Sequence, residues 1–235
     1  TTSLMKKAKK IPSQIEKLEK KTDKLKEEID GLLVQIPNLI HKDVPPGKDS
    51  KENAVKKKFG EEKEYAFSVK NHVEIAEALN LTDFDSSART TGNGFYYLQG
   101  DLALLNQALI QHVINKMVSK GFTYVETPLM LRKNVIAKVT DLHDQKNMIY
   151  KIDGEDLYLI GTSEHSLIGR YVDQILEEKQ LPIKQTSYSM CFRKEIGSHN
   201  IDEKGFYRTH QFNKVEMIVI CKPEESEKFW EEMVD

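Results

Sequence analysis

The sequence predicts an α+β domain built on an antiparallel sheet, preceded by a long helix of the coiled-coil type. Two observations carry this prediction. Residues 11–36 repeat apolar side chains at heptad spacing among lysines and glutamates, which is typical of a coiled-coil helix. From residue 101 onward, segments follow one another in the order helix, strand, hairpin, helix, hairpin, helix. This order favours helices packed on an antiparallel sheet.

Composition narrows the class of protein. The chain has 235 residues, of which 39% are hydrophobic, and this suits one globular domain with a small appendage. No apolar run approaches the roughly 18 residues that a membrane-spanning helix needs, and no secretory signal pattern is present. The two cysteines, Cys191 and Cys221, lack the spacing of metal ligands and favour a reducing compartment. We therefore expect a cytoplasmic protein without a membrane partner.

Charge is distributed unevenly along the chain. Residues 1–70 contain 17 Lys and Arg against 12 Asp and Glu, whereas the remaining residues contain 18 against 25. A basic arm on an acidic body indicates a polyanionic partner for the arm. The alternative is that an exposed helix carries lysines for solubility alone.

The heptad helix is the first element. Its apolar positions are Ile11, Ile15, Leu18, Leu25, Ile29, Leu32 and Ile36, with Thr22 in the central position. A helix this polar is marginal in isolation, so it needs a partner helix from its own chain or another one. This sequence contains no second heptad segment. Pro37 ends the helix, and the turn-forming residues that follow it predict a linker.

The other expected elements are placed by periodicity and by turn and capping residues. The helices are expected at residues 71–79, 82–89, 101–120 and 161–179 and from Pro223 onward. The strands are expected as a short aromatic run within residues 90–101, a run at 122–130 broken by Pro128, and a hairpin at 148–160. Thr162 or Ser163 is the expected cap of the helix at 161–179.

Residues 192–216 carry many charges on two strand-like runs. Because side chains alternate along a strand, Arg193 and Glu195 are expected on one face of the first run. His210, Phe212, Lys214 and Glu216 are expected on one face of the second. Charges on a sheet face either pair across the strands, which is the structural interpretation, or meet a substrate. Arginines clamp phosphate oxygens and a flat ring can stack on a nucleobase, so the face suits a nucleotide.

These residues resemble a known family. FRKE, a loop and RTHQFNKVE resemble motif 2 of class II aminoacyl-tRNA synthetases, and GTSEH resembles the TxE serine-binding signature of seryl-tRNA synthetases. The segment that ends in VETPLM resembles motif 1, with its proline. GFYYLQGDLALL also resembles this family, and LLVQIPNLIH resembles the end of its N-terminal tRNA-binding arm. The resemblance extends over nearly the whole chain.

The resemblance implies a domain organisation. Residues 1–40 would be the second helix of the coiled-coil arm, residues 41–70 a linker, and residues 71–235 a partial class II catalytic core. That core has motifs 1 and 2 and is truncated before motif 3. The first arm helix is also missing, which argues against activity of this chain by itself. Asn200 stands where the family commonly has glycine, and residues 138–147 match the family poorly.

The resemblance also implies a serine pocket. Arg193 would be the catalytic residue, in contact with the α-phosphate of ATP and with the serine carboxylate. Thr162 and Glu164 would complete the pocket, with Glu164 pairing with the serine ammonium group. Glu216 would contact the serine hydroxyl or ammonium group. Thr162 as a helix cap alone is the structural alternative.

The implied ATP contacts lie on the same strands. Glu195 would hold the adenine end, Phe212 would stack on the adenine, and Arg208 would reach the γ-phosphate. Mg²⁺ would bridge the phosphates, and we identify no protein ligand for a metal in this chain. Pro128 of motif 1 would lie at the interface of a homodimer.

The implied function is that of a serine–tRNA ligase. Such an enzyme activates serine with ATP to seryl-adenylate and transfers the seryl group to the 3′ end of tRNA(Ser), which its basic coiled-coil arm holds. Two alternatives stay open at this point. One is a synthetase-like homologue that activates an amino acid for another carrier, and the other is a non-catalytic RNA-binding or dimerisation module.

Overall fold

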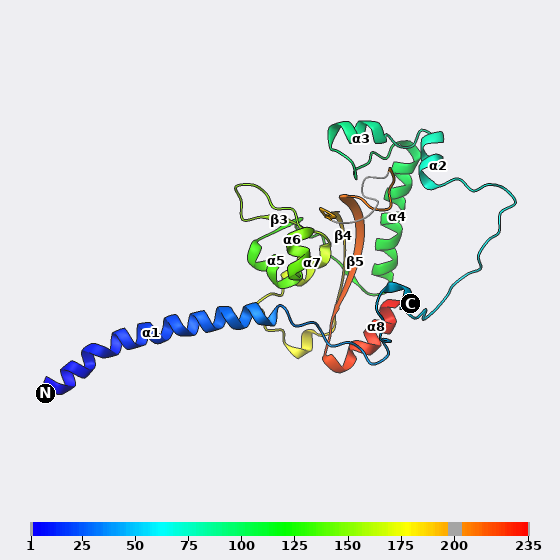
Figure 1. The fold of residues 1–235 in the computed structure, drawn as a ribbon. Coiled ribbons are helices and arrows are strands. Elements are labelled where there is room, and N and C mark those ends of the chain that lie inside the picture. Colours follow the sequence, from blue (N-terminus) through cyan, green and yellow to red (C-terminus); the bar gives the residue numbers. More distant parts are fainter. Residues whose placement is uncertain (1, 197–203, 235) are drawn as a thin grey trace. The chain divides into compact units, whose positions relative to one another are not determined.

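The computed structural model describes residues 2–196 and 204–234, in two compact units, Thr1–Tyr65 and Ala66–Asp235 (Figure 1). The segment 197–203, which includes Asn200, lies outside the described residues. Within the described ranges, no helix combines the length and the apolar character needed to cross a membrane.

The first unit contains the long helix α1 (Thr2–Leu33) and the short 3₁₀ helix η1 (Ser50–Glu52). Helix α1 begins before the heptad segment because Lys, Ala, Leu and Met dominate its start, and all four favour helix. It ends at Leu33, so Ile36 of the expected seam lies outside it. The heptad side chains within the helix are exposed, from 46% at Leu25 to 64% at Leu32. The described residues of this unit therefore bury no coiled-coil seam.

The second unit is built around a three-stranded sheet with the order β1-β4-β5. The strands are β1 (Thr123–Tyr124), β4 (Ile183–Phe192) and β5 (Gln211–Ile220). The long strands β4 and β5 are antiparallel over ten residue pairs, from Ile183 opposite Ile220 to Phe192 opposite Gln211. The short strand β1 runs parallel to β4, with Thr123 opposite Gln185. The antiparallel hairpin expected from residues 192–216 is thus confirmed, and it begins further upstream.

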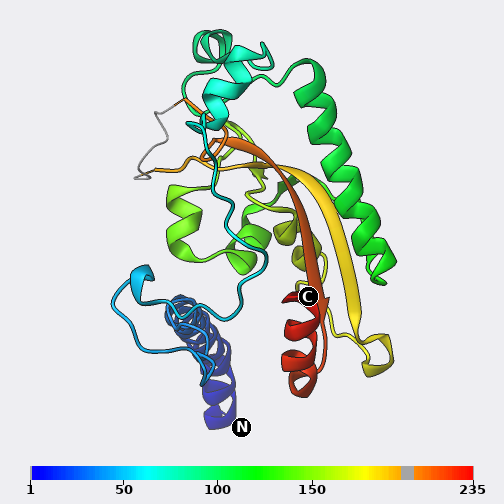
Figure 2. The ribbon, with the colours of Figure 1, turned by 90° about the vertical axis from the view of Figure 1, so that its right-hand side faces the viewer.

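Helices cover both faces of this sheet. Helix α4 (Gly100–Ser119) contacts β4 and β5 and runs beside them in both views (Figures 1 and 2). Helix α7 (Ser163–Gly169) contacts the same strands, and α5 (Lys133–Val139) packs on α7, on the side away from α4 (Figure 1). The sheet is therefore the middle of three layers. Ile160 and Leu167 are fully buried beside it, at 0% exposure.

Smaller elements complete the unit. They are α2 (His72–Ala78), α3 (Phe84–Thr90), α6 (Leu142–Asn147), α8 (Ser226–Val234), η2 (Glu178–Gln180), η3 (Pro223–Glu225), β2 (Met130–Leu131) and β3 (Tyr158–Leu159). Strands β2 and β3 form a separate antiparallel pair. The expected helices at 71–79 and 82–89 are confirmed as α2 and α3. Asn71 and Glu74 form a capping box on α2, and Asp83 caps α3 through the backbone N–H of Ser86.

Three sequence-based expectations differ from the structure. The helix expected to reach residue 179 ends at Gly169, because it packs tightly on α5. A Cβ at Gly169 would lie 2.8 Å from Val135 Cγ1. The aromatic run near Tyr97 forms no strand, only a bridge between Thr82 and Leu98. Helices α5 and α6 were not expected, although Asp141 caps α6 by accepting from the backbone N–H of Asp144 at 2.8 Å.

Candidate active site

The polar face of the β4–β5 hairpin is the floor of the candidate site. Directly opposed residues of antiparallel strands share a face. The register therefore puts together Ser187 with Glu216, Ser189 with Lys214, and Cys191 with Phe212. Helix α7 covers this face, and Ser163 Oγ donates to the carbonyl oxygen of Ser187 at 3.3 Å. We call this surface, with Arg193 at its end, the site face.

Thr162 joins α7 to the site face. It is the N-cap of α7 and is only 5% exposed. Its hydroxyl donates to Glu216 Oε2 at 2.8 Å and accepts from Lys214 Nζ and from the backbone N–H of Glu164, both at 3.2 Å. The cap interpretation of Thr162 is therefore confirmed, and the same hydroxyl also contacts Glu216 on the site face.

Glu216 and Glu164 carry the two carboxylates of this region, and they differ in the partners that they contact. Glu216 forms an ion pair with Lys214, in addition to its hydrogen bond from Thr162. Glu164, in the first turn of α7, is exposed. Among the described residues, only its backbone N–H makes a hydrogen bond at this site. The carboxylate of Glu164 is therefore available to a ligand, whereas that of Glu216 already has a cation beside it.

Arg193 is held at both its backbone and its side chain. Its N–H donates to the carbonyl oxygen of His210 at 2.9 Å, and its own carbonyl oxygen lies 2.9 Å from His210 Nδ1. Its Nε donates to the carbonyl oxygen of Gly161 at 3.1 Å. Its guanidinium carbon lies 5.1 Å from the centre of the Phe212 ring, within the range of a cation–π contact. The guanidinium is thereby held by one hydrogen bond, from Nε, and by its contact with the Phe212 ring.

His165 is a buried neutral group behind Gly161. It is 8% exposed, and its Nδ1 accepts from the backbone N–H of Gly161 at 3.4 Å. Burial, with the positive charges of Arg193 and Lys214 nearby, lowers the pKa of His165 from 6.5 to about 4. One residue therefore connects the two side chains, because the N–H of Gly161 donates to His165 and its carbonyl oxygen accepts from Arg193.

Glu195 and Arg208 form a second charged pair at the end of the hairpin. Glu195 has a φ of +51°, so the strand alternation stops before it. The expectation that Arg193 and Glu195 share a strand face is therefore wrong. Glu195 is instead buried, at 6% exposure, and its Oε2 lies 2.5 Å from Arg208 Nη1. The two residues predicted for the adenine and γ-phosphate ends of ATP are in direct contact.

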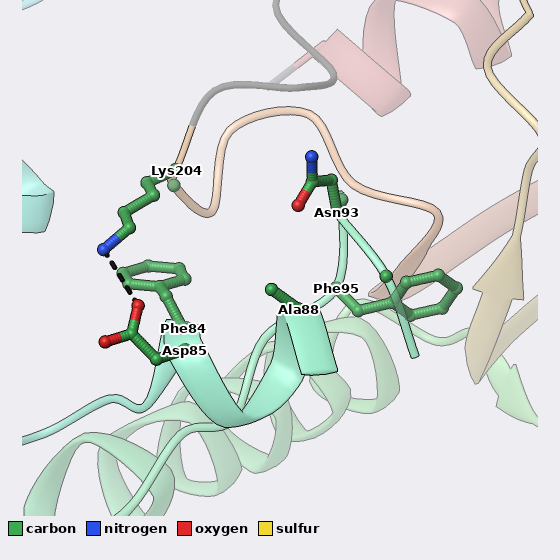
Figure 3. Close-up of a pocket in the computed structure, with 9 residues that line it drawn as sticks. Phe84, Asp85, Ala88, Asn93, Phe95 and Lys204 are labelled. Carbon is green, nitrogen blue, oxygen red and sulfur yellow. Dashed lines mark hydrogen bonds and ion pairs between the residues drawn. The ribbon is translucent and has the colours of Figure 1, made fainter. Parts of the chain in front are cut away.

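The segment that leads into Arg208 is anchored on α2 and α3. Lys204 Nζ lies 3.2 Å from Asp85 Oδ1, beside a pocket of about 60 Å³ between α3 and residues 92–95 (Figure 3). The backbone N–H of Phe206 donates to His72 Nε2 at 3.2 Å, and its ring lies 5.1 Å from that of Phe84. These contacts fix the start of β5, and with it the position of Arg208.

The structure brings most of the predicted site residues together. Those that meet on or beside the site face are Thr162, Glu164, Arg193, Phe212 and Glu216. Pro128 is separate: it is exposed, it precedes β2, and its carbonyl oxygen accepts from Ser166 Oγ at 2.7 Å. Sequence reasoning assigned no role to Lys214, although its parity with Phe212 and Glu216 places it on the same face.

The described residues form no recognisable metal site. In the ranges 2–196 and 204–234, no group of three or more His, Cys, Asp and Glu side chains is arranged to hold a metal ion.

We predict that His165 makes the protein less stable as the pH falls from about 6.5 to about 4. Its pKa is depressed in the folded state, so the unfolded chain binds the extra proton across this window, and unfolding becomes easier as the pH falls. The free energy of unfolding should drop by up to about 3 kcal/mol from this group. Urea denaturation at several pH values measures the drop. In His165→Asn, which keeps an acceptor but cannot take the proton, the slope should be shallower. Equal slopes in both proteins would contradict the assignment.

Comparisons with known proteins agree with this geometry. The family described as tRNA synthetase class II core domain (G, H, P, S and T) matches residues 148–235, which include α7 and the β4–β5 hairpin. A serine–tRNA ligase from Methanocella arvoryzae is 42% identical over 234 residues, covering 100% of this chain and 55% of that protein. A serine–tRNA ligase from Nitrosopumilus maritimus is 36% identical, covering 100% of this chain and 56% of that protein.

Solved structures give the same result. Seryl-tRNA synthetase from Pyrococcus horikoshii, complexed with ATP, superimposes with a TM-score of 0.91 at 37% identity, over 98% of this chain and 56% of that one. Cytoplasmic serine–tRNA ligase from Naegleria fowleri, in complex with AMP, gives a TM-score of 0.83 at 31% identity, over 92% of this chain and 48% of that one. The chain thus spans about half the length of these relatives. Over nearly its whole length the chain is therefore similar to seryl-tRNA synthetases, and its residues 148–235 match the class II synthetase core.

Proposed function

We propose that the full-length protein is a serine–tRNA ligase, which forms seryl-adenylate from serine and ATP and then charges tRNA(Ser). The observation that carries the proposal is the cluster of Thr162, Lys214 and Glu216 beside an arginine that lies over an aromatic ring. From this cluster we infer a small polar binding site for an amino acid, next to a surface suited to a nucleotide. The matching relatives, which carry the name serine–tRNA ligase, support the choice of amino acid.

The proposed serine pocket pairs each charge of the substrate with a side chain. The guanidinium of Arg193 takes the serine carboxylate, and the exposed carboxylate of Glu164 takes the ammonium group. The serine hydroxyl then meets Glu216 and Thr162, which already share a hydrogen bond. A pocket that uses buried polar groups for a substrate hydroxyl rejects an analogue that lacks it, because those groups lose a partner.

The proposed ATP site extends from Phe212 to the Glu195–Arg208 pair. Phe212 offers its ring to the adenine, Glu195 holds the adenine end and Arg208 takes the γ-phosphate. Because Glu195 and Arg208 touch, an ATP molecule that meets both has its triphosphate folded back toward the base. ATP in the Pyrococcus horikoshii structure supports a nucleotide on this fold. Mg²⁺ would accompany ATP through the phosphate oxygens, and we assign no protein ligand to it.

The proposed first step places Arg193 at the reacting atoms. An oxygen of the serine carboxylate attacks the α-phosphorus of ATP, the bond to the β-phosphate breaks, and pyrophosphate leaves. Arg193 contacts both reactants, so it orients them and stabilises the negative charge that develops on the α-phosphate oxygens. In the second step a hydroxyl of the terminal tRNA ribose attacks the seryl carbonyl, and AMP leaves.

We assign tRNA binding to residues 1–40. Residues 1–70 hold 17 Lys and Arg against 12 Asp and Glu, so the arm attracts a polyanion. The exposed heptad side chains of α1 leave a seam for a second helix, which the arm of the family would provide. The chain's two cysteines are both free thiols, which supports our proposal of a cytoplasmic location.

We further propose a homodimer in which α4 and the segment at Pro128 form the contact. Three large apolar side chains in the first half of helix α4 are exposed, with fractions of 69% at Leu104, 63% at Leu105 and 60% at Leu109. Leu129 and Met130, which follow Pro128 in sequence, are 38% and 43% exposed. A gathering of exposed apolar side chains on one helix is typical of a protein–protein contact.

We expect Arg193→Ala to abolish serine-dependent exchange of pyrophosphate into ATP, with a rate loss of at least about hundredfold, because the mutant lacks the charge at the α-phosphate. Arg193→Lys should recover little, since an ammonium cannot form the paired contacts of a guanidinium. Arg170→Ala, on the exposed end of α7, is the matched control and should keep the wild-type rate. The assay uses the full-length protein. Absence of serine-dependent exchange in the wild type, or full activity in Arg193→Ala, would overturn the proposed function.

We expect Leu105→Glu with Leu109→Glu to convert a dimer into monomers, because four carboxylates would then be brought together at a two-fold contact. Sedimentation velocity of the full-length protein measures the change in mass. Leu79→Glu, at the similarly exposed C-cap of α2, is the control and should remain dimeric. A monomeric wild type, or a dimeric double mutant, would contradict the proposed interface.

A further inference from the structure

We propose that Lys214 is the internal counter-ion of Glu216, and that it makes the side-chain end of the pocket select a hydroxyl over an amine. The inference rests on the proposed function, because it assigns a role within the serine pocket. It goes beyond that function by naming a residue that sets specificity without being needed to bind the substrate's own charges.

The geometry ties Lys214 to the two groups at the bottom of the pocket. Its ammonium forms an ion pair with Glu216 and donates to Thr162 Oγ1 at 3.2 Å. Thr162 in turn donates to Glu216 Oε2 at 2.8 Å. The three side chains form a closed ring of contacts, in which each side chain touches the other two. Lys214 and Glu216 are two residues apart on β5, so the strand itself keeps them on one face.

The contacts among Lys214, Glu216 and Thr162 are shielded from water, so the ion pair strongly affects the energy of the Glu216 carboxylate. The side chain of Glu216 is 16% exposed and that of Lys214 is 33% exposed. A carboxylate at that depth without a cation would be strongly unfavourable, and it would attract any ammonium group that could reach it. Of the other ionisable groups nearby, His165 is neutral above about pH 4, and burial raises the pKa of the Cys191 thiol, so neither supplies a positive charge. Lys214 is thus the cation that satisfies Glu216.

A count of charges explains the consequence for selectivity. The site face holds two cations, Arg193 and Lys214, and the carboxylate of Glu216, and the first turn of α7 beside it adds the carboxylate of Glu164. An amino acid with an uncharged side chain brings one carboxylate and one ammonium group, which Arg193 and Glu164 can match. Glu216 and Lys214 then match each other.

The side-chain end of the pocket therefore presents a neutral pair. A substrate hydroxyl can donate to Glu216 without disturbing that pair. A substrate ammonium in the same place would face the like charge of Lys214, and this repulsion is the element that rejects it.

The test compares serine with 2,3-diaminopropionate, in which an amino group replaces the hydroxyl. Amino-acid-dependent pyrophosphate exchange is measured with the full-length protein at about pH 6, where both amino groups carry a proton. In Lys214→Met, which keeps the apolar stem and removes the charge, the ratio of kcat/KM for serine to kcat/KM for the diamino acid should fall by about tenfold or more. Lys214→Arg should keep most of the wild-type ratio, because it restores the charge.

Lys184→Met is the matched control. Lys184 lies on β4 and forms an ion pair with Glu232 outside the site face, so its loss should leave the ratio unchanged. Circular dichroism confirms that each variant is folded, and titration of Lys214→Met with the diamino acid gives binding independently of turnover. An unchanged ratio together with unchanged binding in a folded Lys214→Met protein would overturn the counter-ion role. Wild-type protein without any serine-dependent exchange would instead overturn the proposed function, so the two failures are distinguishable.

Discussion

The hydrogen bond from the Thr162 hydroxyl to Glu216 is the interaction on which the site depends. It connects the N-terminus of α7 to the middle of β5, two elements 54 residues apart in sequence. The same hydroxyl caps α7, so the start of the helix and the polar floor of the sheet cannot move independently. Directly before Thr162, the backbone of Gly161 links two side chains, because its N–H donates to His165 and its carbonyl oxygen accepts from Arg193. The position of the arginine and the position of the two carboxylates are consequently set by one short segment, residues 161–165.

The three layers of the second unit explain why that segment is so well fixed. The face of the sheet that carries the charges is covered by α7, whose Leu167 is fully buried, and α4 packs on the opposite face. Hydrophobic burial on both sides holds the long strands in place, while the polar residues satisfy one another along the strip between β5 and the start of α7. Phe206 contacts His72 and Phe84, and these contacts also hold the nearby Arg208 in position. Arg208 lies shortly after residues 197–203, which are outside the described residues.

Sequence reasoning predicted the parts of the site that follow from local rules. Alternation on β5 places Phe212 and Glu216 together, and the Thr162 cap follows from a threonine before a helical repeat. It failed where tertiary contacts decide the structure. The positive φ of Glu195 breaks the alternation that the prediction assumed, and no residue type at that position signals it. The end of α7 depends on the close approach of Gly169 to Val135, a partner 34 positions away in sequence. Helices α5 and α6 were missed because their apolar repeats are short, although the Asp141 cap was a usable signal.

We propose above all that the site face binds serine and ATP side by side, in the positions that the seryl and adenylate parts of seryl-adenylate occupy. Calorimetric titration of the full-length protein with a non-hydrolysable seryl-adenylate analogue tests it most directly. We predict one analogue bound per chain, at least about hundredfold more tightly than serine or ATP alone, because the analogue engages both subsites at once. Prior saturation with serine and ATP should block it. An analogue that does not bind, or that binds without competition from serine and ATP, would contradict the assignment of the site.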